Sequence, residues 1–179
     1  MILADQLRTN DLRIGSPFMN TFKSILGTLT GLESNKVVPY PQVKEGLEQP
    51  AKPAPHIDWL AYSLPRLSSF NVGKLVQCVG EYSNVITSQP LEITLIAYGP
   101  NSSETISAVV DGMLLDANTY PLREFRCYYQ RAVSPNTDIE EHNGKRYLAT
   151  SCVLKFIKST VRRYDIKSIK TVPITIKTV

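Results

Sequence analysis

The join between an alternating segment and a helical segment, in residues 89–117, limits the possible folds of this chain more than any other feature. Leu91, Ile93 and Leu95 alternate with polar residues, which predicts a half-buried strand over residues 91–98. After Gly99-Pro100, apolar residues recur at helical spacing: Ile106, Val109, Val110, Met113, Leu114 and Ala117. Asn101 and Glu104 have the spacing of a capping box. The pattern predicts a capped helix whose apolar stripe lies across a sheet.

The same order of strand, glycine turn, hydroxyl residues and helix also occurs in phosphate-binding sites. A phosphate loop needs several glycines and usually a lysine. The corner YGPNSSET has one glycine, no lysine nearby, and Pro100, which removes an N–H. The sequence therefore predicts a structural turn here.

The remaining segments predict an α+β fold, a mostly antiparallel sheet with two helices packed on one face. A first helix is expected over residues 16–30, with Pro17 in its first turn and Gly31 at its end. Asn143-Gly144 predicts a hairpin that leads into a strand with Leu148, Cys152, Leu154 and Phe156 on one face. Strands are expected at residues 37–43, 56–64, 74–86, 91–98, 125–133, 146–157 and 166–179.

The length of 179 residues suits one domain. We expect an N-terminal arm at 1–15, a core at 16–165 with a proline-rich surface loop at 39–55, and a basic C-terminal edge strand at 166–179. No apolar run reaches the roughly 18–20 residues of a membrane span. The N-terminus does not have the pattern of a signal peptide. The protein is therefore expected to be made in the cytoplasm and to have no membrane partner.

No group of residues has the pattern of an active site. Cys78, Cys127 and Cys152 are far apart, lie in apolar segments, and are expected to be core thiols. The acidic segment 138–142, which contains His142, is expected to be a solvated hairpin tip, and His56 follows the proline-rich loop. The sequence predicts no enzyme, no cofactor and no metal.

Two further patterns each leave two interpretations. Residues 144–179 contain nine Lys or Arg residues and one Asp, so they form either an interaction surface or a strand protected against edge aggregation. The segment FRCYYQR, residues 125–131, interleaves aromatic and basic residues as in strands that stack on nucleic acid. Strand alternation explains it more simply, with Phe125, Cys127 and Tyr129 on the core face.

Two longer stretches carry a resemblance to a known family. QPLEITLIAYGPNSSETISAVVDGMLLD joins an alternating strand through Tyr-Gly-Pro to a capped helix, and KRYLATSCVLKFIKSTVRR follows a charged hairpin. In these features the chain resembles the neck terminator and tail terminator proteins of tailed bacteriophages, over residues 89–179 and in the helix at 16–30. The proline-rich segment 39–55 and the basic C-terminus depart from the family pattern.

The resemblance implies a structural protein of the virion neck that forms a ring, a hexamer or in some necks a dodecamer. Such a ring joins the portal and adaptor complex to the tail, and viral DNA passes through its lumen. Contacts between subunits are expected at these residues: Lys170, Val172, Ile174, Ile176, Lys177, Arg162, Arg163 and Tyr40. The alternative is a small nucleic-acid-binding domain that uses the basic C-terminal segment.

Overall fold

A computed structural model describes residues 15–39, 53–68, 73–79, 82–142 and 144–165. These residues form the predicted α+β fold with a mostly antiparallel sheet. The sheet has eight strands, and three helices pack against it where two were predicted. The elements are α1 (Ser16–Thr30), β1 (Val37–Pro39), β2 (Trp59–Tyr62), β3 (Arg66–Leu67), β4 (Gly73–Val79), β5 (Tyr82–Tyr98), α2 (Ser102–Gly112), α3 (Asp116–Thr119), the 3-10 helix η1 (Tyr120–Phe125), β6 (Cys127–Ala132), β7 (Asn136–His142) and β8 (Lys145–Asp165).

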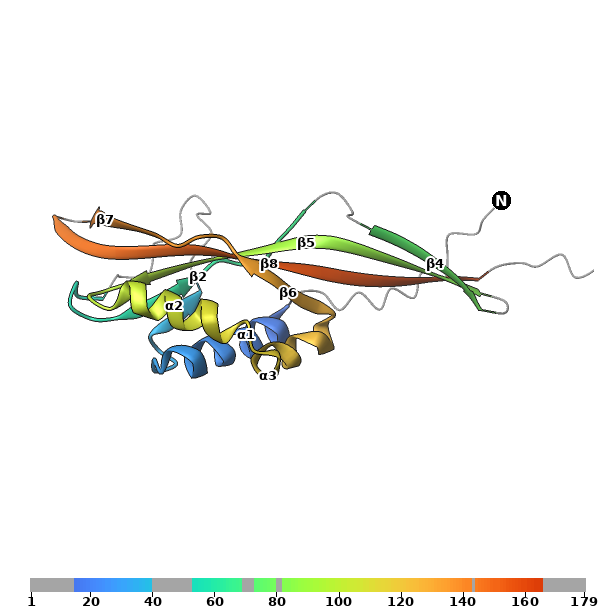
Figure 1. The fold of residues 1–179 in the computed structure, drawn as a ribbon, viewed down its shortest axis with the longest axis horizontal. Helices are drawn as coiled ribbons and strands as arrows, with labels where there is room; N and C mark the ends of the chain where they lie inside the picture. Colours follow the sequence, from blue (N-terminus) through green and yellow to red (C-terminus); the bar gives the residue numbers. More distant parts are fainter. Residues whose placement is uncertain (1–14, 40–52, 69–72, 80–81, 143, 166–179) are drawn as a thin grey trace, which may run out of the picture.

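Two long strands form the axis of the molecule. β5 and β8 pair along the whole of β5, from Tyr82 opposite Asp165 to Tyr98 opposite Ala149. The other edge of β5 pairs with β2, β3 and β4 in succession, and the other edge of β8 pairs with β7 and β6 (Figure 1). β1 lies outside β2 and is parallel to it, at the edge of the described sheet.

The helices cover one face of one half of this ribbon (Figure 1). Leu91, Ile93 and Leu95 of β5 point to the helices, as the alternation predicted, and are fully buried. Phe22 of α1 contacts three aromatic rings in this core, with ring centroids 6.0 to 6.1 Å away: Phe18, Tyr62 and Phe156. α1 ends at Gly31, whose φ of 67° is the left-handed conformation expected there.

A smaller cluster lies on the opposite face of the sheet. The rings of Trp59 and Tyr98 stack with centroids 4.4 Å apart, and Tyr147 meets Tyr98 edge-on. All three are buried. The body of the molecule is therefore packed on both faces of the sheet.

Beyond the helices, the ribbon continues as a three-stranded extension (Figure 1). We call it the wing: β4, residues 82–88 of β5 and residues 159–165 of β8, which pair in that order. The sequence predicted one strand over residues 74–86, and this prediction was wrong. The chain turns between Val79 and Tyr82, so that the segment forms a hairpin.

Pro90 lies inside β5, where a proline is unusual. The carbonyl oxygen of Pro90 accepts a bond from the backbone N–H of Ser68 at 2.9 Å, so the nitrogen of Pro90 faces the same edge. On that edge, the pairing of β3 with β5 ends at Leu91, and the pairing of β4 with β5 begins at Ser88. The missing N–H therefore falls in a gap between two neighbouring strands and interrupts no ladder.

The prediction of a hairpin tip for the acidic segment was also wrong. Asp138 to His142 belong to β7 and pair with β8 up to Lys145, so they are strand residues and not a tip. His142 pairs with Lys145, which agrees with the predicted hairpin, and Gly144 has φ 70°. Leu148 is exposed because it lies beyond the helix layer, opposite the exposed Ile139.

The helix stripe predicted through Leu114 and Ala117 stops earlier. α2 ends at Gly112, where the Asn118 side-chain amide donates to the Gly112 carbonyl at 2.8 Å. A Cβ on Gly112 would collide with Leu29 of α1, so the two helices approach most closely at this point. The chain turns away, which leaves Leu114 and Ala117 exposed instead of packed on the sheet.

Candidate subunit interface

The corner after β5 is closed to anions. The Asp58 carboxylate accepts from the backbone N–H of Asn101 at 2.9 Å and from its side-chain amide at 2.8 Å. The predicted capping box is therefore wrong, since the Asn101 side chain bonds to Asp58 and no side-chain cap bond forms within α2. A carboxylate already lies against the start of α2, and it would repel a phosphate.

In the described part of the chain, no three His, Cys, Asp or Glu side chains form a group that could hold a metal ion. His56 is exposed. Cys127 and Cys152 are core residues as predicted, but Cys78 is exposed on β4, so the prediction was wrong for this thiol.

The three cysteines are expected to differ strongly in reactivity. Burial raises the pKa of Cys127 to about 11, against the opposing effect of the Lys158 ammonium, and burial also raises the pKa of Cys152. Only the thiolate reacts quickly, so at pH 8 the native chain, at a concentration where copies do not bind each other, should expose one fast thiol, at Cys78. Titration with a thiol-reactive dye should count one group in the folded protein and three in denaturant. Loss of the fast group in Cys78→Ser is the control, and fast labelling of that variant would contradict the assignment.

The wing has apolar side chains on both faces, and no helix of the described residues lies against either face. On the face that continues the helix side, Val76 of β4 is 52% exposed and pairs with Val85 of β5. Lys74, Arg162 and Tyr164 are exposed on the same face, by strand parity. The opposite face has a row of Leu75, Ile86 and Val161, one from each strand. A sheet with both faces in water is rare. Apolar side chains exposed on both faces of the wing therefore indicate that another molecule covers them.

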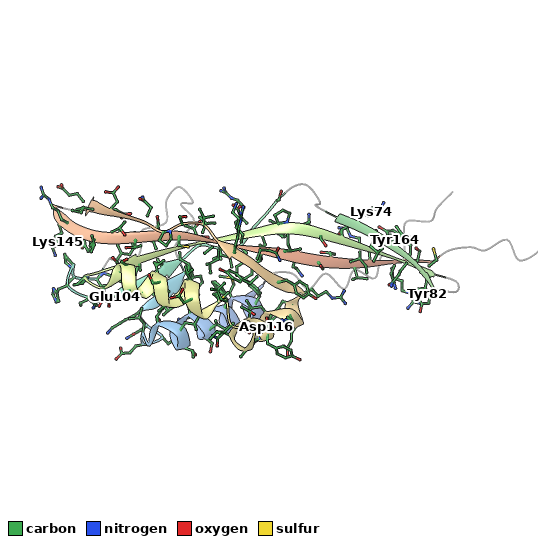
Figure 2. All side chains as sticks on the ribbon, viewed as in Figure 1. Lys74, Tyr82, Glu104, Asp116, Lys145 and Tyr164 are labelled. Carbon is green, nitrogen blue, oxygen red and sulfur yellow. The ribbon has the colours of Figure 1, made fainter. Side chains whose placement is uncertain are left out.

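A second exposed apolar surface lies where α2 turns into α3. We call it the leucine patch: Leu114, Leu115 and Tyr120, which are 69%, 61% and 64% exposed. Asp111 and Asp116 are exposed on either side of the two leucines. Figure 2 shows Asp116 on the helix layer and Lys74, Tyr82 and Tyr164 on the wing.

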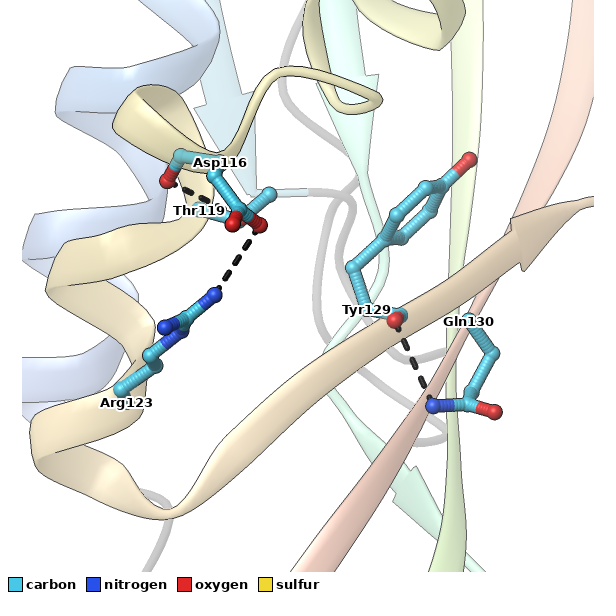
Figure 3. A network of polar contacts seen from close by, with 5 residues as sticks. All are labelled: Asp116, Thr119, Arg123, Tyr129 and Gln130. Atoms are coloured by element: carbon cyan, nitrogen blue, oxygen red, sulfur yellow. Dashed lines mark hydrogen bonds and ion pairs between the residues drawn. The ribbon is translucent and has the colours of Figure 1, made fainter.

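The local structure fixes the shape of the leucine patch. Asp116 accepts from the Arg123 guanidinium at 2.9 Å and from the hydroxyl of Thr119, through its backbone oxygen, at 3.3 Å (Figure 3). The same guanidinium lies 5.6 Å from the centroid of the Tyr120 ring. The ring of Tyr120, the first residue of η1, is thus held in place by the Arg123 side chain, although most of its surface faces solvent.

The aromatic segment 125–131 is half core and half surface, as its alternation predicted. Phe125 and Tyr129 pack against the core, and Tyr128 is exposed. The amide of Gln130 donates to the Tyr129 carbonyl at 3.3 Å, beside a bulge in the pairing with β8 (Figure 3). Tyr129 is therefore unavailable as a platform for a base.

The structure places only part of the predicted interface. Arg162 and Arg163 lie side by side in β8 and point to opposite faces of the wing, and the guanidinium of Arg163 lies 3.4 Å from the centroid of the Tyr82 ring. The other predicted residues lie outside the described residues: Tyr40, Lys170, Val172, Ile174, Ile176 and Lys177. The same holds for the predicted N-terminal arm at 1–15 apart from Gly15, for the predicted C-terminal edge strand at 166–179, and for most of the proline-rich loop at 39–55.

Sequence reasoning missed the wing and the leucine patch. The adjacent apolar residues Leu75 and Val76 were one available signal, since they must point to opposite faces of any strand. The run Met113-Leu114-Leu115 was another, because three consecutive residues span about 200° of a helix and cannot all face the same core.

The sequence matches no family model and no curated protein. Among the described residues, no helix combines the length and the apolar character that crossing a bilayer requires.

Proposed function

We propose that this protein is a ring-forming structural subunit of the neck of a tailed bacteriophage. In this role the ring joins the portal and adaptor complex to the tail, and the genome passes through its lumen. The motifs on which the resemblance rests occupy the central elements of the fold: the C-terminal half of β5, the Gly99-Pro100 corner, α2 and the long strand β8.

The observation that carries the proposal is the wing, which no helix of the described part of the chain covers. It projects past the helices, has apolar side chains on both faces, and ends far from the body of the molecule (Figure 1). If a neighbouring copy covered these side chains, the contact would remove a large apolar surface from water. Subunits that contact each other through different surfaces close into rings when the rotation between them allows it.

A catalytic function has less support. Among the described residues, no three His, Cys, Asp or Glu side chains form a group that could hold a metal ion, and the two buried thiols have raised pKa values, which oppose thiolate chemistry.

The expected result is an oligomer in solution. Light scattering after size exclusion should give a mass of six or twelve times the 20.0 kDa of one chain. A monomer at every concentration would contradict the proposal. A variant that lacks residues 166–179 tests the predicted C-terminal arm separately, because intact rings of that variant would exclude the arm from ring assembly.

The second candidate, a nucleic-acid-binding domain, is favoured by the cations of the wing. Lys74 and Arg162 lie on one face beside the exposed ring of Tyr164, a combination that can hold a single strand. This candidate predicts a monomer or dimer whose affinity for an oligonucleotide falls steeply as salt is raised.

A further inference from the structure

We propose that the helix-side face of the wing of one copy binds the leucine patch of the next copy. This inference rests on the proposed function and names the surfaces that would join the ring. The occupant of each surface is thus a second copy of this chain.

The two surfaces have complementary composition. The wing face presents Val76 and Tyr164 with two cations, Lys74 and Arg162. The leucine patch presents Leu114, Leu115 and Tyr120 between two carboxylates, Asp111 and Asp116. Stable interfaces have an apolar and aromatic centre with charged groups at the rim, and opposite charges there select the partner and orient it.

The carboxylates of the patch differ in their own contacts. Asp116 is engaged by Arg123, with the guanidinium 2.9 Å from its oxygen. Asp111 has no such ion pair among the described residues, and it lies on the last turn of α2 beside the leucines. Asp111 is therefore the carboxylate that we assign to Arg162 of the neighbouring copy.

The position of the two surfaces makes the contact heterologous. The leucine patch belongs to the helix layer, whereas the wing is the part of the sheet that the helix layer does not reach (Figure 2). Two copies joined through different surfaces still have one free wing face and one free leucine patch. Further copies therefore bind until a ring closes. Wing-to-wing pairing is disfavoured, because it would bring Lys74 and Arg162 against the same cations of the partner.

The test is an exchange of charges. Arg162→Glu and Asp111→Lys should each raise the dissociation constant of the assembly by about tenfold or more, because each places like charges together. The double variant Arg162→Glu/Asp111→Lys should recover much of the loss. Gln77→Glu, which adds a negative charge on the other face of the wing, is the control and should assemble like the wild type.

The apolar contribution is tested in parallel. Leu115→Ser should weaken assembly, whereas Ile139→Ser should not, although these two side chains are almost equally exposed at 61% and 63%. Sedimentation velocity gives the assembly state, and circular dichroism checks that every variant keeps the native fold.

The outcomes separate this inference from the proposed function. If the wild type forms rings and Arg162→Glu, Asp111→Lys and Leu115→Ser form the same rings, the inference is wrong and the proposed function still stands. A wild-type monomer that binds an oligonucleotide and loses this binding in Arg162→Glu overturns both. Single variants that lose the ring, with recovery in the double variant, support both.

Discussion

Replacing Gly99 by alanine is expected to leave little folded protein. Gly99 has φ 110°, a conformation that side chains with a Cβ rarely adopt. A Cβ there would also collide with the Asp58 carboxylate and would come within 2.8 Å of the Asp58 Cα and the Ile57 carbonyl oxygen. Backbone strain and overpacking together should cost about 3 to 5 kcal/mol, a large part of the stability of a domain.

The matched control for this prediction is Gly31→Ala. Gly31 also has a positive φ, of 67°, but nothing lies within 4 Å of the position of an added Cβ. The cost should be limited to about 1 to 2 kcal/mol of backbone strain. Urea unfolding followed by circular dichroism should rank wild type, Gly31→Ala and Gly99→Ala in that order. Equal effects of the two substitutions would show that the packing of the corner against Asp58 contributes nothing.

Phe22→Ala is the second change with a large expected effect. The side chain of Phe22 is fully buried. Its ring contacts Phe18 of the same helix, Tyr62 of β2 and Phe156 of β8, so it joins α1 to two strands of the sheet. Its removal should lower the free energy of unfolding by about 3 to 5 kcal/mol, through lost transfer energy and the cavity that remains. The helix layer would also lose its main anchor on the sheet.

Tyr128→Ala serves as the control for Phe22→Ala, because it removes an aromatic ring from the exposed face of β6. Its effect should stay within about 0.5 kcal/mol. Both variants need the same protein concentration in the urea titration, since assembly adds to apparent stability. A loss below about 1 kcal/mol for Phe22→Ala would contradict the assigned core.

Local chemistry made part of this fold predictable. The apolar stripe of α1, the αL residue Gly31 and the alternation of Leu91, Ile93 and Leu95 each follow from one period or one special backbone position. Asn143-Gly144 marked the turn before β8 for the same reason. In these places tertiary packing agrees with the local preference, so the sequence was sufficient.

Other parts depend on contacts between distant residues. The N-terminal half of β5 contains Asn84, Ser88 and Pro90, which favour turns, yet pairing with β8 and β4 holds it extended. Asn101 had the spacing of a capping residue, but Asp58, which is 43 positions away, takes its amide. The end of α2 at Gly112 depends on its approach to Leu29 of α1.

The candidate interface was the least predictable part. The basic segment indicated Arg162 and Arg163, but no periodicity showed that these residues lie on a sheet without a helix layer. Leu114 fitted the apolar stripe of a longer helix, and only the early end of α2 exposes it. An exposed apolar surface of this kind comes from the exact end of an element, which a periodic pattern does not define.

Electron microscopy of the purified wild-type protein tests whether copies of this chain form a ring. We expect class averages of closed rings with a central opening, and their loss in Arg162→Glu with recovery in Arg162→Glu/Asp111→Lys. Single particles of one chain at every concentration, or open filaments without closed rings, would contradict this expectation.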